Sequence, residues 1–360
     1  IQLKELVTRK ATSEFESNPT ILRADVLRAL KASEADLFPA CSRIPSPEGT
    51  IARRQERALL GAIMEADAPL VIHADGGVGK SVLAARLAAG MPMGSAAVLY
   101  DCYGVGLYRN ALDFRHRHQD GLVQIANEMA SRGWCHPLVP TVHADAKAFM
   151  RAFTHRLEQA ARHVRARSPK GVICVIVDAA ANAETAAREQ GDPGSFVRDL
   201  IRMPIPQGIR LVFTSRSHRV VDFDPPSEAI KIQLESFDDA ETGQHLRGRF
   251  PRATAKEVAE FGHLSSHNPR VQALALESEG RLSEVLKALG PEPTTVYAAI
   301  GGLLQGAIDK LKSEAGGVAA EQIDRICVGL ATLRPLVPIS VLARLSDVPE
   351  GAVRSFANDL

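Results

Sequence analysis

Short apolar runs alternate with longer segments of helical periodicity through residues 45–235 of the chain. Apolar runs bounded by turn residues are typical of buried strands, whereas apolar residues spaced three and four apart indicate amphipathic helices. We expect strands at residues 70–74, 97–102, 172–178, 210–214 and 230–234. We expect helices at residues 21–32, 51–66, 122–132, 144–166 and 195–202, and directly after Lys80. Strands that alternate with helices predict a parallel sheet covered on both faces.

Helical patterns alone follow residue 235. Two pairs have the spacing of capping boxes and predict helices that end near residues 250 and 264: Ser236 with Asp239, and Thr254 with Glu257. A further helix should begin at Asn268-Pro269, another at residues 295–313 with its apolar stripe in a core, and another at residues 322–333. Residues 334–360 predict two short helices around a turn, which is the helical half of a winged-helix domain.

Composition is that of a multi-domain intracellular protein. A chain of 360 residues exceeds the usual size of one core. Its formal net charge of +1 gives no global electrostatic reason to expect nucleic acid or an anionic membrane as a partner. The five cysteines lack C-x-x-C pairing, and no apolar run has the length of a spanning helix, so we expect a cytoplasmic protein. Because the chain begins at Ile1 rather than at methionine, we expect a piece of a longer protein.

The segment from Val71 to Ser81 has the pattern of a phosphate-binding loop, with Ala74 in place of the first glycine of G-x-x-x-x-G-K-[ST]. An apolar strand precedes it and a helix-forming segment follows it. Backbone N–H groups of such a loop surround phosphate oxygens, the lysine reaches the β- and γ-phosphates, and the hydroxyl ligates Mg²⁺. We therefore expect ATP or ADP with Mg²⁺, bound by Asp75, Gly76, Gly77, Val78, Gly79, Lys80, Ser81 and Val82.

The strand expected at residues 172–178 ends in Asp178, which is the pattern of a Walker B element. Its carboxylate should share the metal with Ser81. Hydrolysis generally requires a further carboxylate to orient the attacking water, and the next three residues are alanines. Glu184 is the nearest candidate. The sequence therefore predicts nucleotide binding with slow or absent hydrolysis, and an acid lost at Ala181 would account for the pattern.

Cationic residues occur at three further places. Arg216 closes the strand expected at residues 210–214 and should sense the γ-phosphate, so we expect catalytic roles for Lys80, Asp178 and Arg216. His218 and Arg219 are expected on the surface of the following loop. The basic and aromatic cluster at residues 108–118 is expected in a solvated loop, with phosphate or protein binding as the alternative.

These motifs resemble those of the STAND class of signalling NTPases, which contains NB-ARC and NACHT switches. ADGGVGKS is similar to their phosphate-binding loop, VFTSR to their arginine-bearing strand, and HNPRVQALAL to their G-x-P segment. By this resemblance Pro269 packs on the adenine, and DAAANA resembles a D-x-x-D Walker B whose second acid is Ala181. The resemblance covers residues 45–360 and is strongest to prokaryotic antiviral (Avs-type) proteins. It implies a nucleotide-dependent conformational switch, a homo-oligomer on activation, and a protein trigger such as a phage protein.

The expected architecture is α/β, with a P-loop NTPase parallel sheet of the ASCE type followed by helical and winged-helix domains. We place an N-terminal helical linker region at residues 1–44, the nucleotide-binding domain at 45–235, a helical lid at 236–290 and a winged-helix-like domain at 291–360.

Two other classes remain open. An AAA+ ATPase acting on DNA, such as an origin-recognition or loader protein, also joins a P-loop to a winged helix, but it needs an acidic pair and a basic recognition helix. The last expected helix offers only Arg354 and Asn358 against Glu350 and Asp359, so we expect no nucleic-acid partner and no membrane partner. A small-molecule kinase would place an acceptor pocket near Asp101 and Arg109.

Overall fold

The chain divides into two compact units in the computed structural model, which describes residues 2–12, 20–46, 48–110, 112–140, 144–278, 280–315, 317–333 and 337–359. The first unit contains Ile1–Thr50, Arg54–Asp75 and Lys80–Leu234. The second contains Ile51–Arg53, Gly76–Gly79 and Glu235–Leu360. The glycines of the loop therefore belong to the second unit by their contacts, although the flanking residues belong to the first.

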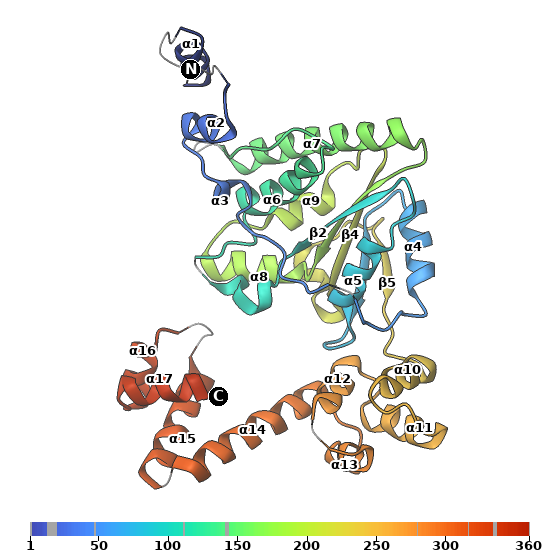
Figure 1. Ribbon diagram of the computed structural model, residues 1–360, viewed down its shortest axis with the longest axis vertical. Helices are drawn as coiled ribbons and strands as arrows, with labels where there is room; N and C mark the ends of the chain where they lie inside the picture. Colours follow the sequence, from blue (N-terminus) through green and yellow to red (C-terminus); the bar gives the residue numbers. More distant parts are fainter. Residues whose placement is uncertain are drawn as a thin grey trace. The chain divides into compact units, whose positions relative to one another are not determined.

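The first unit is built on a five-stranded sheet of order β2-β3-β4-β1-β5, with every neighbouring pair parallel (Figure 1). The strands are β1 Leu70–Ala74, β2 Ala96–Asp101, β3 Ile173–Asp178, β4 Ile209–Arg216 and β5 Ile230–Gln233. All five predicted strands are confirmed. One strand, β4, separates β1 from β3, as in the ASCE type of P-loop NTPase. The chain therefore has the parallel sheet of a P-loop NTPase, and β3 is buried along its whole length because helices cover both faces.

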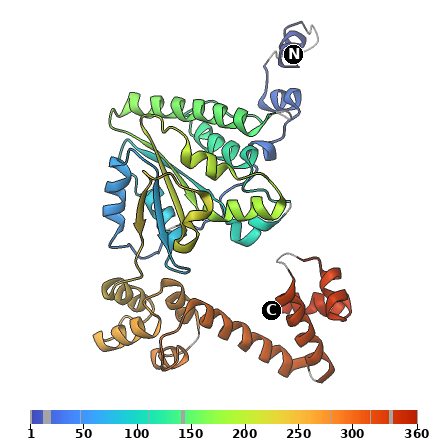
Figure 2. The same ribbon diagram turned by 180° about the vertical axis from the view of Figure 1, so that it is seen from behind.

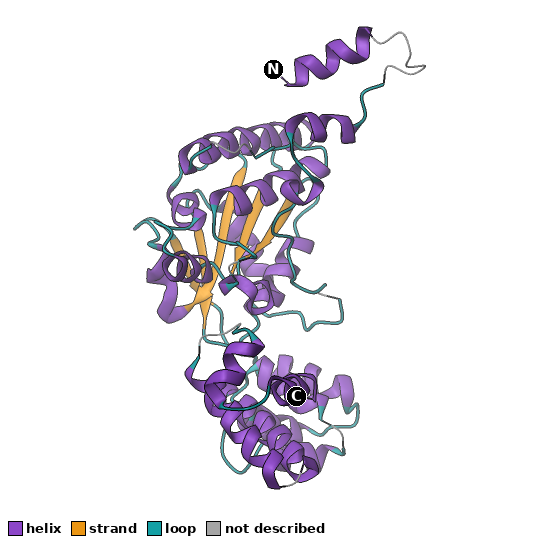
Figure 3. Cartoon of the chain, turned by 90° about the vertical axis from the view of Figure 1, so that its left-hand side faces the viewer, coloured by secondary structure: helices purple, strands orange, loops and turns teal. Residues whose placement is uncertain are grey.

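Helices pack on both faces of this sheet (Figure 3). On one face α6, α7 and α9 share a core with alternate strand residues such as Tyr100, Val175 and Phe213, because successive side chains of a strand point to opposite faces. On the other face α5 contacts four strands and α4 contacts α5. The helices are α1 Gln2–Thr12, α2 Arg23–Leu30, α3 Glu34–Leu37, α4 Glu56–Glu65, α5 Lys80–Ala89, α6 His118–Ser131, α7 Ala146–Arg167, α8 Ala181–Gln190 and α9 Phe196–Arg202, with 3-10 segments η1 Gly104–Arg109 and η2 Ser217–Phe223.

Helix α8 was not among the predicted helices, and its first residues supply hydrogen-bond acceptors to Arg219. The Arg219 guanidinium donates to the Ala181 carbonyl (2.8 Å) and to Asn182 Oδ1 (2.8 Å) at the start of this helix. The sequence placed Arg219 on the surface of a loop, and the structure shows it partly exposed and held by these hydrogen bonds. Arg219 ties η2 to α8, whereas His218 is exposed as expected.

All regular elements among the described residues of the second unit are helices (Figure 2). Its helices are α10 Asp239–Arg249, α11 Ala255–Leu264, α12 Pro269–Glu277, α13 Leu282–Ala288, α14 Val296–Ala315, α15 Gly317–Thr332, α16 Ile339–Ser346 and α17 Glu350–Asp359. The first four form one core around Phe261 and Val271, and the last three form another around Ile326 and Phe356. Helix α14 adds residues to both cores. The assignment of residues 291–360 to a winged-helix domain remains a prediction.

Two expectations for this unit are corrected. The capping box of α10 is Asp238 with Glu241, not Ser236 with Asp239, whereas the box of Thr254 with Glu257 is confirmed. The apolar stripe of α14 is only partly in a core. Ile308 and Leu311 pack against the last core, but Ile300 and Leu304 are 38% and 46% exposed. Within the described ranges, no helix combines the length and apolar composition that crossing a bilayer requires.

Candidate functional site

The loop between β1 and α5 depends on glycines for its shape. Gly77 has φ +80° and Gly79 has φ +93°, while Gly76 and Val78 do not have positive φ. Such an alternation turns successive backbone N–H groups toward one side and forms a concave anion-binding nest. A Cβ added to Gly77 would lie 2.7 Å from Oδ1 of Asn268, so this position has no room for a side chain.

Three consecutive carbonyls of the loop, at residues 76–78, accept hydrogen bonds from donors of the second unit. In loop order the donors are Nδ2 of Asn268 (3.0 Å), the backbone N–H of Arg270 (3.1 Å) and Nη1 of Arg53 (2.8 Å). In a trans peptide the carbonyl and the following N–H point in opposite directions. The N–H groups of residues 77–79 therefore face away from these donors.

Lys80 begins α5 and lies half-buried beside the loop. Its Nζ donates to the carbonyls of Ala74 (2.9 Å) and Asp75 (2.7 Å). Burial lowers the pKa of Lys80 to about 8, with Asp178 opposing and Arg216 adding to the effect. A buried ammonium with a lowered pKa gains from an anionic ligand, because the ligand restores the stability of the charged form.

Ser81 and Asp178 meet at the carboxyl end of the sheet. Ser81 Oγ donates to Asp178 Oδ2 at 2.6 Å, and Thr214 Oγ1 donates to Oδ1 at 2.5 Å. Burial raises the pKa of the Asp178 carboxyl above its usual value, and these two hydrogen bonds oppose the rise. The pair supplies a hydroxyl and a carboxylate oxygen, which are the hard ligands that Mg²⁺ prefers. The residues present therefore suit a magnesium ion carried by a phosphate ligand.

The remaining predicted residues fall into two groups. Arg216 ends β4 in register with Ala74, is exposed, and influences Lys80 electrostatically, so it lies at the same edge of the sheet as the loop. Val82 is in the first turn of α5. Pro269 belongs to the second unit, where it is the first residue of α12 between two residues that bond to the loop carbonyls.

The residues after Asp178 make a tight turn without a free carboxylate. Ala179 has φ +54°, which is rare for a residue with a Cβ, and its N–H donates to Thr214 Oγ1 at 2.9 Å. Glu184 is buried and its Oε1 accepts from both the Oγ (2.6 Å) and the N–H (3.2 Å) of Ser195. Glu184 therefore holds the start of α9.

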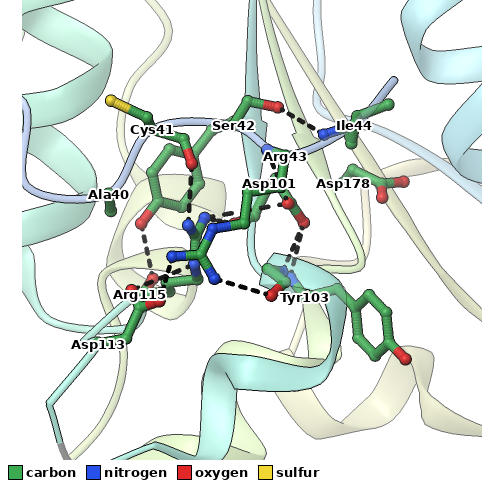
Figure 4. A network of polar contacts seen from close by, with 12 residues as sticks. Ala40, Cys41, Ser42, Arg43, Ile44, Asp101, Tyr103, Asp113, Arg115 and Asp178 are labelled. Carbon is green, nitrogen blue, oxygen red and sulfur yellow. Dashed lines mark hydrogen bonds and ion pairs between the residues drawn. The ribbon is translucent and has the colours of Figure 1, made fainter.

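A second polar network, which the sequence did not reveal, lies beside Asp178 on the neighbouring strand (Figure 4). The carboxylate of Asp101 accepts from the N–H groups of Tyr103 (2.8 Å), Gly104 (3.0 Å) and Arg43 (3.2 Å). These bonds occupy both oxygens of Asp101. Asp101 therefore fixes the backbone of Arg43, Tyr103 and Gly104 at this edge of the sheet.

Arg115 is a further member of this network (Figure 4). It is 1% exposed, and its guanidinium donates to the carbonyls of Asp101 (2.8 Å) and Cys41 (2.8 Å), with Asp113 at 3.4 Å. His116 beside it is also fully buried. The expectation of a solvated basic loop is wrong for these two residues. Arg115 donates to the carbonyls of Asp101 and Cys41, and Nε2 of His116 lies 2.6 Å from the carboxylate of Asp192. The sequence does not mark Arg115 for burial, because one of its acceptors, the Cys41 carbonyl, is 74 residues away.

The chain is similar to known proteins in structure but not in sequence. No protein-family model matches it, and no curated protein matches its sequence. Among solved structures, it is similar to a Walker-type ATPase of Pyrococcus abyssi, with a TM-score of 0.48 and 14% identity over 89% of this chain and 92% of that one. It is also similar to the ORC1 protein of Aeropyrum pernix in complex with DNA, with a TM-score of 0.42 and 14% identity over 91% and 86%.

A third similar structure is a STAND protein with a tetratricopeptide repeat sensor from Pyrococcus horikoshii. The TM-score is 0.37 and the identity 16%, over 88% of this chain and 44% of that chain, so this chain spans less than half of that protein. All three TM-scores are below 0.5, and the fold assignment rests on the strand order and the loop instead.

Proposed function

We propose that this protein binds ATP or ADP with Mg²⁺ and acts as a nucleotide-dependent switch of the STAND class. The observation that carries the proposal is the 2.6 Å hydrogen bond between Ser81 and Asp178 at the end of a glycine loop. Two ligands of the kind that hold a magnesium ion thereby lie next to a lysine whose lowered pKa favours an anionic partner.

Each residue has a distinct part in this proposal. The amides of residues 77–79 bind phosphate oxygens, and Lys80 supplies positive charge to the terminal phosphates. Ser81 and Asp178 would hold the magnesium ion, which neutralises phosphate charge when bound. Arg216 senses the γ-phosphate from the end of β4, and Pro269 supports the base, as the STAND resemblance implies.

Hydrolysis is proposed to be slow or absent. Of the carboxylates around Asp178, Asp101 accepts three backbone hydrogen bonds and Glu184 accepts two from Ser195. A general base needs an oxygen within hydrogen-bond reach of the water, whereas both oxygens of Asp101 accept from the backbone and Glu184 is buried against the start of α9. Slow turnover would keep the nucleotide in place, which is what a switch requires.

The wider biological role is proposed from the resemblance to STAND proteins. We propose that nucleotide exchange changes the conformation of the chain and permits homo-oligomerisation, that a protein trigger such as a phage protein starts the exchange, and that the output is antiviral defence. A ligand shifts a conformational equilibrium only by binding its two states unequally. The proposal therefore requires that ATP and ADP favour different states.

The decisive experiment has two steps. The purified protein is denatured and any released nucleotide is identified by chromatography, and the stripped protein is then titrated with ATP and ADP in the presence and absence of Mg²⁺. Lys80→Ala should abolish tight binding, whereas Lys170→Ala, which removes an exposed lysine from a loop, should leave it unchanged. Equal affinities of wild type and Lys80→Ala would refute nucleotide binding at this loop.

Two further readouts separate the alternatives. Rapid ATP turnover would contradict the slow hydrolysis proposed here. Salt-dependent binding to duplex DNA, with a slope that reflects several phosphate contacts, would favour a DNA-acting AAA+ ATPase over a signalling switch.

A further inference from the structure

Arg53 is buried in the second unit, although the segment that carries it has no regular structure. Its three guanidinium nitrogens donate to the carbonyl of Val78 (2.8 Å), the carbonyl of Glu235 (2.5 Å) and Oε1 of Glu241 (3.2 Å). Its guanidinium carbon also lies 4.8 Å from the ring centroid of Phe237. A planar guanidinium with partners on every nitrogen and an aromatic ring on its face is fixed in position.

One of these three acceptors belongs to the phosphate-binding loop. The Val78 carbonyl and the Gly79 N–H are parts of the same peptide unit, and they point in opposite directions. Holding the carbonyl toward Arg53 therefore directs the Gly79 N–H away from it, to the concave side of the loop. A Cβ on Gly79 would lie 3.6 Å from Nη1 of Arg53, so the loop passes directly against this side chain.

The other two loop carbonyls are held differently. Their donors, the Asn268 side chain and the Arg270 N–H, are both at the start of α12. Arg53 donates to the carbonyl of the third peptide, and Glu241 keeps Arg53 in place from the first turn of α10. Glu241 also accepts from the N–H of Asp238 as part of the capping box, so its own position is fixed by the helix start.

We propose that Arg53 is a positioning residue of the phosphate-binding loop, which orients the Val78–Gly79 peptide so that its N–H faces the phosphates of a bound nucleotide. The orientation of the peptide is independent of the proposed function, whereas its use for phosphate binding rests on it. Lysine cannot replace Arg53 fully, since one ammonium on a flexible stem does not reproduce a planar fork.

The test compares Arg53→Met with Arg57→Met, which removes the same charge from an exposed position on α4. Affinity is measured by calorimetry for ADP and for inorganic tripolyphosphate, at a temperature where circular dichroism shows all variants folded. Arg53→Met should bind tripolyphosphate about tenfold more weakly, which is the loss expected for one hydrogen bond to a charged group. Arg57→Met should bind as the wild type does, and Arg53→Lys should fall between the two.

A second measurement does not need any ligand. Amide order parameters of residues 77–79 are measured by NMR relaxation in nucleotide-free protein, where a rigid backbone gives about 0.85 and a flexible one less than about 0.6. They should fall in Arg53→Met and not in Arg57→Met. If Arg53→Met does not fold, Arg53→Lys carries both measurements, with smaller changes of the same sign.

The outcomes separate the two proposals. Wild-type protein that binds neither ligand refutes the proposed function, while a fall in the order parameters would still support the orienting role of Arg53. Unchanged order parameters overturn that role. Lower order parameters with unchanged tripolyphosphate affinity overturn the use of this peptide for phosphate binding.

Discussion

Replacing Asp178 by asparagine should separate stability from ligand binding, because the structure fixes how an amide would sit there. Thr214 Oγ1 already accepts from the Ala179 N–H, so its proton is committed to Asp178 Oδ1. The asparagine oxygen therefore takes the Oδ1 position. Its NH₂ then faces Ser81 Oγ, which can accept instead of donate because a hydroxyl does either. Both hydrogen bonds survive the change.

Asp178→Asn removes the negative charge of the carboxylate, and the loss of this charge determines whether the variant is more or less stable than wild type. Burial raises the pKa of Asp178, so its ionised form is destabilising in the fold. The destabilisation is absent below the ordinary pKa of an aspartate, grows as the pH rises from that value to the raised pKa, and is constant at higher pH. At pH 8 without nucleotide, Asp178→Asn should be neutral or up to about 2 kcal/mol more stable, which raises Tm by as much as about 6 °C in a unit of this size.

Asp178→Ala is the matched control. It removes both acceptors and leaves the buried Thr214 hydroxyl without its partner, and this should destabilise the protein by about 2 kcal/mol. With saturating Mg²⁺ and ADP, wild type should become more stable than Asp178→Asn. Ligand at about a hundred times its Kd stabilises wild type by about 2.7 kcal/mol, and neither variant should gain as much.

The assay is differential scanning fluorimetry with EDTA and then with Mg²⁺ and ADP. A large destabilisation of Asp178→Asn without ligand, or a shift by Mg²⁺ and ADP equal to that of wild type, would refute the reasoning about this carboxylate.

Three further changes have expected outcomes of their own. Because Lys80 has a pKa of about 8 and gains a proton when a phosphate binds, ATP affinity measured by calorimetry should be about twentyfold weaker at pH 9.5 than at pH 7.5; a flat profile would contradict the lowered pKa. Ala179→Gly should raise Tm by about 2 °C, since the φ of +54° is unfavourable only for a residue with a Cβ, and a lower Tm would count against backbone strain. Arg115→Met should lower the free energy of unfolding in urea by about 3–5 kcal/mol because it leaves buried acceptors unpaired. Arg109 is partly exposed, so Arg109→Met should change the free energy of unfolding by less than about 1 kcal/mol. Equal effects of the two substitutions would show that burial of the arginine does not determine the loss of stability.

The sheet and the proximity of Ser81 to Asp178 could be predicted from the sequence for one physical reason. Buried parallel strands are continuous apolar runs, and the carboxyl ends of such strands meet at one edge of the sheet. A lysine and a hydroxyl after one strand and an aspartate ending another must therefore approach each other. Ser81 and Asp178 do so, although they are 97 residues apart in sequence.

Helix α8 was missed because its buried residues are almost all alanines. Alanine gives a weak apolar signal, so a search for apolar periodicity passes over Ala181, Ala183 and Ala186. Helix propensity would have found it, since alanine, glutamate and glutamine rank high. Gly191, with φ +75° at the end of the helix, supplied a stop signal as well.

The positions of Arg53 and Arg115 could not be predicted, because their partners come from distant segments. Arg53 bonds to Glu241, 188 residues away, and Arg115 to the carbonyl of Cys41, 74 residues away. An isolated arginine in a loop is most often solvated. Only the folded chain shows that these two guanidinium groups are buried among carbonyls.

The structure gives a reason for the alanines that follow Asp178, which the sequence pattern alone did not give. The sequence suggested that an acid had been lost at Ala181, but Ala180 and Ala181 are 0% and 3% exposed and belong to the apolar core beneath the sheet edge. A carboxylate at residue 181 in this fold would enter that core, where an unpaired charge is strongly unfavourable. The alanines therefore pack α8 against the sheet. The burial of Ala181 therefore argues against a catalytic side chain having been removed at this position from an otherwise intact site.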